Sequence, residues 1–190
     1  ACAPFRRLHV CDQNLEQIRP EQITSTDNLL ADVCLAAKHE GESIIKNYPQ
    51  DRNNNEVICT ALARSFADIG DIVRGKDLYL GDQQEKLYLE NNLKKIFAKI
   101  HENLNDKIKS NYNDSEGNYF KLREDWWTAN RDQVWKAITC NAPKDANYFE
   151  YNSGKFFKFS NDQCGHNNGG APPTNLDYVP QFVRWFEEWA

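Results

Sequence analysis

Apolar residues recur at steps of three or four along most of this chain, which is the spacing of one helical face. The clearest example lies within residues 56–73, where Gly75 follows the last apolar position as a helix stop signal. The apolar stripe of this segment consists of Ile58, Leu62, Phe66, Ile69 and Val73. The pattern predicts a helix over 56–73, with polar residues mostly off the stripe.

The same period predicts four more helices. Ser25 or Asp27 can cap a first helix, which Pro49 ends. Residues 83–111 and 119–139 carry two further apolar stripes, and Pro180 suits the first turn of a short last helix. The periodicity therefore indicates a chain built mainly from helices.

Two segments lack this period. Residues 1–22 have the composition of an irregular arm, and residues 141–177 are dense in Asn, Gly and Pro, which is typical of a long loop. Alternating strand patterns are scarce. We expect an all-α fold: a disulfide-linked helical bundle with long irregular loops.

Six cysteines are spread across the chain, at positions 2, 11, 34, 59, 140 and 164. No two of them have C-x-x-C spacing, and the histidines form no ligand pair with them, so we expect no metal site. An even number of widely spaced cysteines favours disulfides and an oxidising compartment. Their pairing stays open at this level.

The net charge of the chain limits the classes of ligand that it can bind. The 190 residues carry a net charge of −5, which disfavours general nucleic-acid binding because affinity for phosphates comes mainly from Lys and Arg. No stretch approaches the ~20 apolar residues of a membrane span. The chain lacks an initial Met, and we interpret it as a segment of a larger protein, whose address its own ends do not reveal.

The candidate binding residues are lysines of the predicted helix 83–111. They gather away from its apolar stripe, and they are Lys94, Lys95, Lys99, Lys107 and Lys109. A row of lysines on a rigid helix can match the regularly spaced sulfates of a heparan-type glycan. The alternative is a solvated face whose charge is offset by Glu90, Glu102 and Asp106.

Catalytic signatures are missing from the sequence. It contains no Gly-rich phosphate loop, no G-x-S-x-G and no H-E-x-x-H. The adjacent carboxylates that glycoside hydrolysis needs are better explained as helix surface. We therefore expect neither an enzyme nor a bound cofactor.

Other conspicuous residues have structural explanations. The pair Trp126–Trp127 is expected in the core, as are Trp185, Phe186 and Trp189, because aromatic residues at helical spacing contribute large buried areas. Structural ion pairing is the favoured role of the charged set Arg64, Asp68, Asp71 and Arg74. Arg6–Arg7 either contacts a glycan or fastens the arm to acidic helices; the sequence favours neither.

Four segments resemble one protein family. They are residues 3–16, 29–42, 59–81 and 122–130, the last extended to Trp135 and continued by 178–189. Together they resemble the Duffy-binding-like domains of malaria parasites, alpha class, of the erythrocyte membrane protein 1 family. Such domains are longer at both ends. The resemblance implies that residues 1–22 end a first subdomain and that 23–190 form the helical second one.

This resemblance implies a function and a location. The chain is expected to be a host-cell adhesion module of a variant surface antigen, on the extracellular face of the infected red-cell membrane. Its partner would be a sulfated glycan, blood-group carbohydrate or receptor protein. The alternative is a scaffold subdomain that supports a binding site elsewhere in the domain.

The resemblance also implies disulfides. Similar domains of the red-cell invasion ligands lack both cysteines that correspond to Cys34 and Cys140, which suggests that those two are partners. Cys59 would then pair with Cys164. Cys2 and Cys11 resemble cysteines that bond to partners upstream, and in this segment they would be free or bonded to each other.

Overall fold

The computed structural model describes residues 2–23, 25–47, 55–79, 81, 83–152, 156–167 and 169–190. Its longer helices are α3 (Thr26–Asn47), α4 (Asn55–Arg74), α5 (Gln83–Glu102), α7 (Phe120–Ile138) and α9 (Gln181–Trp189). The helices predicted from periodicity are therefore confirmed, and the fold is a disulfide-linked all-α bundle. Within the described residues, no helix combines the length and apolar character that a membrane span requires.

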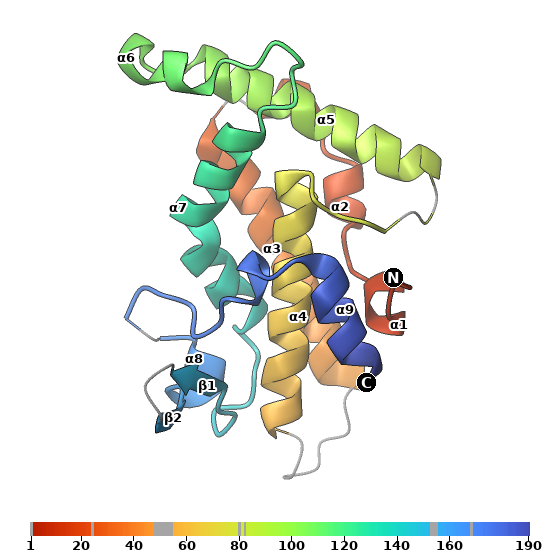
Figure 1. Ribbon diagram of the computed structural model, residues 1–190, viewed down its shortest axis with the longest axis vertical. Coiled ribbons are helices and arrows are strands. Elements are labelled where there is room, and N and C mark those ends of the chain that lie inside the picture. Colours follow the sequence, from red (N-terminus) through yellow and green to blue (C-terminus); the bar gives the residue numbers. More distant parts are fainter. Residues whose placement is uncertain are drawn as a thin grey trace.

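Helices α3, α4 and α7 run along the long axis of the molecule, and α5 crosses one end of them (Figure 1). Their shared core is aromatic at its centre: the ring of Phe66 lies 5.1 Å from that of Trp127 and 5.2 Å from that of Trp135, between ring centres. Trp126 and Trp127 are both buried, as predicted for this pair. Apolar burial is the main contribution that holds the bundle together.

Helices α3 and α7 approach each other unusually closely at Gly41. A Cβ atom at this position would lie 2.1 Å from the carbonyl oxygen of Ile138, so only glycine fits there. Further toward the start of both helices, burial raises the pKa of the Cys34 thiol, and the nearby carboxylate of Asp132 on α7 adds to the effect. The two contacts show that α3 and α7 run in the same direction.

Several predicted boundaries differ from the structure. The helix expected over 83–111 ends at Glu102, and a capped turn leads into α6 (Asp106–Lys109) and the 3₁₀ turn η3 (Ser110–Tyr112). The side chain of Asn105 accepts a hydrogen bond from the backbone N–H of Lys107. This bond caps the start of α6, so a new helix begins after Asn105 and the long helix does not continue. The extended backbone of Asn105 interrupts the helix, although the apolar period of the sequence continues past it.

The two segments predicted as irregular contain short elements. The arm folds into α1 (Phe5–Leu8), α2 (Gln13–Glu16) and the 3₁₀ turn η1 (Pro20–Gln22). The loop after α7 contains a hairpin of β1 (Phe149–Asn152) and β2 (Phe156–Phe159), then α8 (Asp162–Gly165) and η4 (Leu176–Tyr178). These elements are shorter than the window over which periodicity can be recognised.

The last helix corrects a further expectation. Trp185 is buried as predicted, but Phe186 and Trp189 are 76% and 61% exposed, so they do not belong to the core. Phe186 lies about 100° from Trp185 around α9, whereas Trp189 lies only about 40° from Trp185 but is the last residue of the helix. Their aromatic character misled the prediction.

Cys59 on α4 and Cys164 on α8 form a disulfide, with 5.4 Å between their Cα atoms, as expected from the resemblance. The expected Cys34–Cys140 bond is not formed, and both residues are free thiols. Cys34 precedes Gly41 by about two helical turns, or ~10 Å, whereas Cys140 lies beyond Ile138. This offset along parallel helices exceeds the ~7 Å that a disulfide can span between Cα atoms. Cys2 and Cys11 are also free.

Candidate glycan-binding surface

Helix α5 presents one face to the bundle and the other to solvent. Its buried residues are Leu89, Asn92, Leu93, Ile96, Phe97, Ile100 and His101. Asn92 donates a hydrogen bond to the carbonyl oxygen of Ile18 (3.3 Å), and the buried Arg123 of α7 pairs with Glu90 (2.7 Å). The helix is thus held on two sides, and its outer residues have a fixed orientation.

The predicted lysines of α5 do not form a single row. At about 100° per residue, Lys95 and Lys99 lie within about 40° of each other on the outer face. Lys94 is half-buried and lies about 100° away, at the other edge of that face. The amine of Lys99 donates a hydrogen bond to the carbonyl oxygen of Pro20 (2.7 Å), so this lysine also ties the arm to α5.

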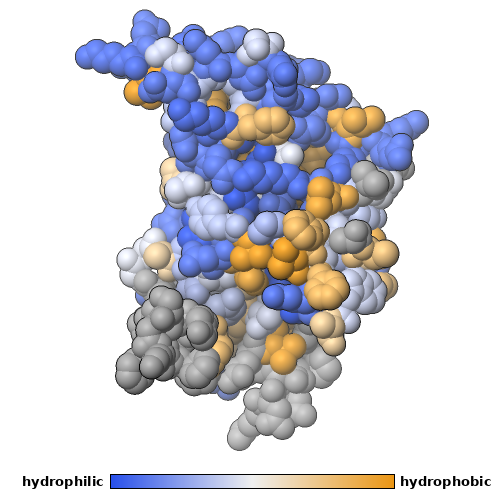
Figure 2. All heavy atoms as spheres, viewed as in Figure 1, coloured by the Kyte–Doolittle hydropathy of each residue, from blue (hydrophilic) through white to orange (hydrophobic). Residues whose placement is uncertain are grey.

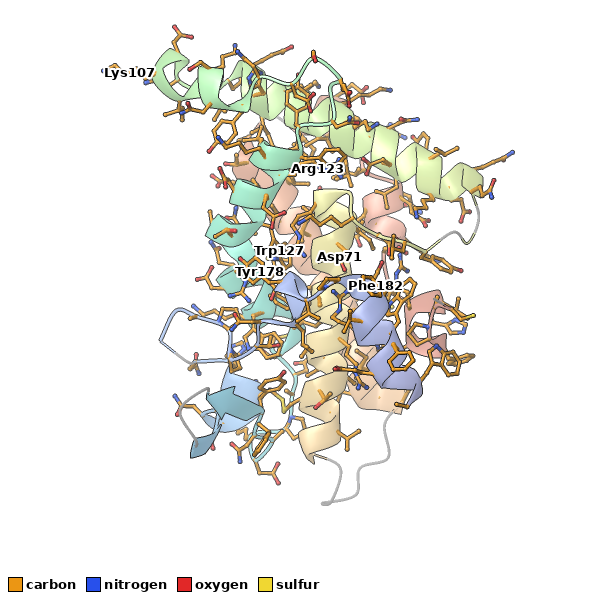
Figure 3. The ribbon with its side chains drawn as sticks, viewed as in Figure 1. Asp71, Lys107, Arg123, Trp127, Tyr178 and Phe182 are labelled. Carbon is orange, nitrogen blue, oxygen red and sulfur yellow. A yellow bond between two sulfur atoms is a disulfide. The ribbon has the colours of Figure 1, made fainter. Side chains whose placement is uncertain are left out.

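The remaining two lysines lie on α6, past the end of α5. Lys107 is exposed and projects from the far end of the molecule (Figure 3). Lys109 turns back and donates to the carbonyl oxygen of Glu102 (3.2 Å), while its own carbonyl oxygen lies 3.2 Å from Nε2 of His101. Lys109 therefore closes the end of α5, where a cation complements the helix dipole.

The carboxylates that could have offset these lysines do not pair with them. Glu90 is held by Arg123, and within the described residues no ion pair joins any of the five lysines to an acidic side chain. The amines of Lys94, Lys95 and Lys107 make no hydrogen bond to the described part of the protein. These three residues are the cations of the predicted set that remain available to a ligand.

Two basic residues near this surface were missed by the sequence analysis. Arg19 is exposed and precedes Pro20, whose carbonyl oxygen accepts the hydrogen bond from the amine of Lys99. Lys121 of α7 is exposed, donates to the carbonyl oxygen of Asn111 and lies over the ring of Tyr112 at 5.5 Å. No sequence signal links either residue to α5, because both are brought there by tertiary packing. We call Lys94, Lys95, Lys107, Arg19 and Lys121 the basic surface.

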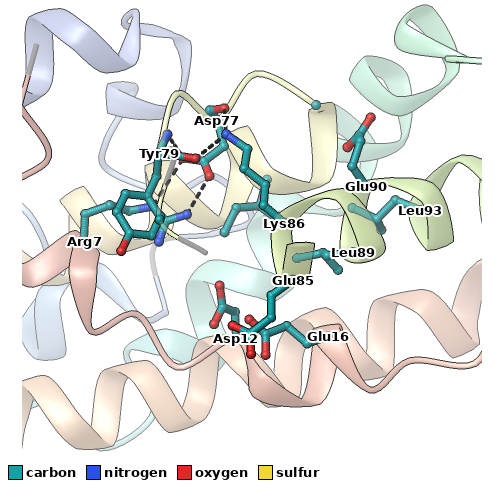
Figure 4. Close-up of a pocket in the computed structure, with 13 residues that line it drawn as sticks. Arg7, Asp12, Glu16, Asp77, Tyr79, Glu85, Lys86, Leu89, Glu90 and Leu93 are labelled. Atoms are coloured by element: carbon teal, nitrogen blue, oxygen red, sulfur yellow. Dashed lines mark hydrogen bonds and ion pairs between the residues drawn. The ribbon is translucent and has the colours of Figure 1, made fainter. Parts of the chain in front are cut away.

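A cavity of about 200 Å³ beneath the start of α5 is a weaker candidate (Figure 4). Its walls carry Asp12, Glu16 and Glu85, which would repel a sulfated ligand. Its cations are already engaged: Arg7 pairs with Asp77 (2.6 Å), and Lys86 donates to the carbonyl oxygen of Asp77 (2.9 Å). Burial, opposed by Arg7, raises the pKa of Asp12. The cavity does not suit an anion.

The charged set on α4 is structural, as predicted for three of its four members. Asp68 pairs with Arg6 (2.7 Å) and Arg184 (2.8 Å), and Asp71 pairs with Arg74 (3.1 Å). Arg64, the fourth member, makes no ion pair with any residue that the structure describes. The arm is thus fastened to α4 through Arg6, which decides between the two roles that the sequence left open.

Burial and neighbouring charges act in opposite directions on these two carboxylates. Burial alone would raise the pKa of Asp68, but the guanidinium groups of Arg6 and Arg184 hold it below its ordinary value. Burial raises the pKa of Asp71 to about 6 despite the opposing charge of Arg184. Both groups lie under α9, so they fix the position of that helix and are withdrawn from any ligand.

Comparisons with known proteins place the chain in a family. The model of the Duffy binding domain matches residues 1–184, and no curated protein sequence matches the chain. The NTS-DBL1α1 domain of Plasmodium falciparum membrane protein 1 (PfEMP1), varO strain, is 50% identical with a TM-score of 0.92. This similarity covers 100% of the present chain but 43% of the other, so the chain spans less than half of that relative.

Further solved structures have the same fold. The NTS-DBL1α and CIDRγ double domain of the varO strain is 51% identical, with a TM-score of 0.91 over 27% of its chain. A PfEMP1 DBLβ domain bound to ICAM-1 is 39% identical, with a TM-score of 0.75 over 44% of its chain. The chain belongs to the Duffy-binding domain family, whose PfEMP1 members are extracellular adhesion modules and not enzymes.

Proposed function

We propose that this chain contributes to host-cell adhesion by binding a sulfated, heparan-type glycan through its basic surface. The observation that carries the proposal is the set of amines on Lys94, Lys95 and Lys107, which no described carboxylate neutralises. Lys94 and Lys95 lie on α5, which is held rigidly at Glu90 and Asn92, and Lys107 lies on α6, which follows it. Rigid placement lowers the entropy cost of binding an extended polyanion.

The family supports the adhesive role but leaves the ligand open. Related DBLβ domains are bound to ICAM-1, a protein receptor, in their solved structures. The present chain carries a net charge of −5, so attraction for a sulfated glycan must come from a local group of cations. We also propose that residues 1–22 end one subdomain and 23–190 form the next, on the extracellular face of the infected red-cell membrane.

Heparin chromatography of charge-reversed variants tests the glycan site. The variant Lys94→Glu, Lys95→Glu, Lys107→Glu should elute at clearly lower salt than the parent protein, since ionic contacts weaken with ionic strength. The side-chain amines of these lysines make no hydrogen bond to described residues, so the fold should persist, which circular dichroism verifies. Lys99 and Lys109 are left intact because their amines hold the arm and the end of α5.

A matched control separates a site from overall charge. Lys38, Lys46 and Lys136 are exposed on α3 and α7, away from α5, and reversing all three changes the net charge equally. The control should elute near the parent. Equal displacement of both variants would contradict a localised glycan site, and a parent protein that does not bind heparin would favour the scaffold role.

A further inference from the structure

Two large apolar residues lie exposed on the outer face of α5, beside the basic surface. They are Leu87, which is 62% exposed, and Tyr88, which is 57% exposed. The structure describes every residue of α5, and no other large apolar residue of this helix is exposed to this degree. Figure 2 shows that hydrophilic residues dominate the surface around α5 on the face in view. Exposed apolar residues that lie together within a polar surface are typical of an interaction site.

The apolar pair lies in line with the two available lysines of α5. Leu87 precedes Lys94 by seven residues, and Tyr88 stands in the same relation to Lys95. Seven residues make almost two helical turns, so each apolar side chain lies within about 20° of its lysine and about 10 Å from it along the axis. Asn91 lies between the two pairs and is exposed. A ligand that follows this face of α5 away from the lysines therefore reaches Leu87 and Tyr88 next.

The charge of the surface changes sign along α5. Carboxylates gather at its start, where Glu85 of the first turn lines the same cavity as Asp12 and Glu16 of the arm (Figure 4). The cations of that cavity are already bonded within the protein. The lysines of the basic surface lie further on, toward the end of the helix. A sulfate is therefore attracted at the end of α5 and repelled at its start, so the part of a ligand that lies over Tyr88 should carry no sulfate.

The ring of Tyr88 has no partner within the described part of the protein. It makes no hydrogen bond, ring stack or cation–π contact with any residue that the structure describes. An aromatic ring is negative on its face, so it attracts the weakly positive C–H groups on one side of a sugar ring. Tyrosine supplies such contact area with little loss of conformational entropy, because its side chain has only two torsions. Tyr88 is therefore suited to stack against an uncharged sugar.

We propose that Tyr88 stacks on an uncharged sugar ring of the same glycan whose sulfates the basic surface binds. The site then takes a heparan-type chain at the point where an unsulfated stretch, with its N-acetylglucosamine rings, meets a sulfated one. The uronate carboxylates of the unsulfated stretch lie on alternate rings and can face solvent. This inference rests on the proposed function and adds to it a neutral subsite, which Leu87 extends at its side.

Calorimetric titration with two oligosaccharides of equal length tests the neutral subsite. One is derived from heparin and sulfated throughout, and the other joins an unsulfated, N-acetylated stretch to a sulfated one. Tyr88→Ala should raise the Kd of the mixed oligosaccharide about two- to tenfold, the usual range for one aromatic contact, and change that of the fully sulfated one much less. The salt dependence of binding should match that of the parent, because no cation is removed. Tyr88→Phe keeps the ring and should bind like the parent.

Phe186→Ala is the matched control, because it removes an aromatic side chain that is 76% exposed on α9 instead of α5, and it should leave both Kd values unchanged. Circular dichroism verifies that each variant is folded. Equal affinity of Tyr88→Ala and the parent for the mixed oligosaccharide would overturn the proposal, as would an equal loss for both oligosaccharides or a loss in Tyr88→Phe as large as in Tyr88→Ala.

The same titrations separate this proposal from the proposed function. If Tyr88→Ala binds like the parent while the charge-reversed lysine variant loses affinity, the glycan site stands as a purely ionic one without the neutral subsite. A parent protein that binds neither oligosaccharide contradicts both.

Discussion

Replacing Gly41 by alanine should push two helices of the bundle apart. The new Cβ would lie 2.1 Å from the carbonyl oxygen of Ile138 and 3.0 Å from its carbonyl carbon, and both are backbone atoms that no side-chain rotation can move. Restoring a separation of 3.0 Å requires α3 and α7 to part by 0.9 Å (3.0 minus 2.1). Overpacking of this kind costs up to about 3 kcal/mol.

Part of this loss is offset within the helix. Alanine is favoured over glycine in a helix interior by about 1 kcal/mol, so the expected net loss in the free energy of unfolding is about 2 kcal/mol. For a chain of this size, that corresponds to a fall in melting temperature of about 4–8 °C. Urea denaturation followed by circular dichroism measures the loss directly.

An exposed position of the same helix calibrates the propensity contribution. Ala31→Gly should destabilise by about 1 kcal/mol, because that site has no close neighbour and only the helix propensity changes. If Gly41→Ala is as stable as the parent or more stable, the close approach of α3 to Ile138 does not exist in solution. The stability of Gly41→Ala relative to the parent would then indicate that α3 and α7 pack differently from the arrangement described.

Four further predictions concern the disulfide, the free thiols and the buried charges. Replacing Cys59 and Cys164 by serine opens a link across 105 residues and should cost about 4–5 kcal/mol in the chain-entropy model, and a loss in urea denaturation below about 1 kcal/mol would contradict it. Alkylation of the unfolded, unreduced protein should modify all four of Cys2, Cys11, Cys34 and Cys140; if peptide mapping shows Cys34 and Cys140 both unmodified, the two are bonded to each other. In the folded protein Cys34 should react slowly, because burial, aided by Asp132, raises its pKa to about 11. Arg184→Gln should cost about 1.5–3 kcal/mol in the same denaturation assay, because Asp68 and Asp71 each lose one buried cationic partner while Arg6 and Arg74 remain, and a variant as stable as the parent would contradict this.

The main helices could be predicted because their apolar residues face a single core. The stripe from Ile58 to Val73 is buried along its whole length, and the period of 3.6 residues records that burial. Asn105 was not recognised as a helix break, since the apolar period continues across it to Ile108. The decisive factor was a local side-chain cap, which periodicity does not register.

The candidate site was predictable only in part. The lysines of α5 were visible as a group, but the bonds from Lys99 to the arm and from Lys109 to the end of α5 depend on contacts distant in sequence or on the new turn. Arg19 joins the surface through packing of the arm. For α9, the sequence did not separate the buried Trp185 from the exposed Trp189, because the two lie on nearly the same face and a helix period does not say where along the helix its packing ends.

The arrangement of α5 and the two chain ends has a mechanical consequence. Helix α5 crosses one end of the bundle, while both ends of the chain lie together toward the other end, beside α9 (Figure 1). A tether pulling at the chain ends against a ligand held on α5 would load α3, α4 and α7 lengthwise. The tension would enter α4 through the ion pairs of Asp68 with Arg6 and Arg184, and α4 in turn is bonded to α8 through Cys59.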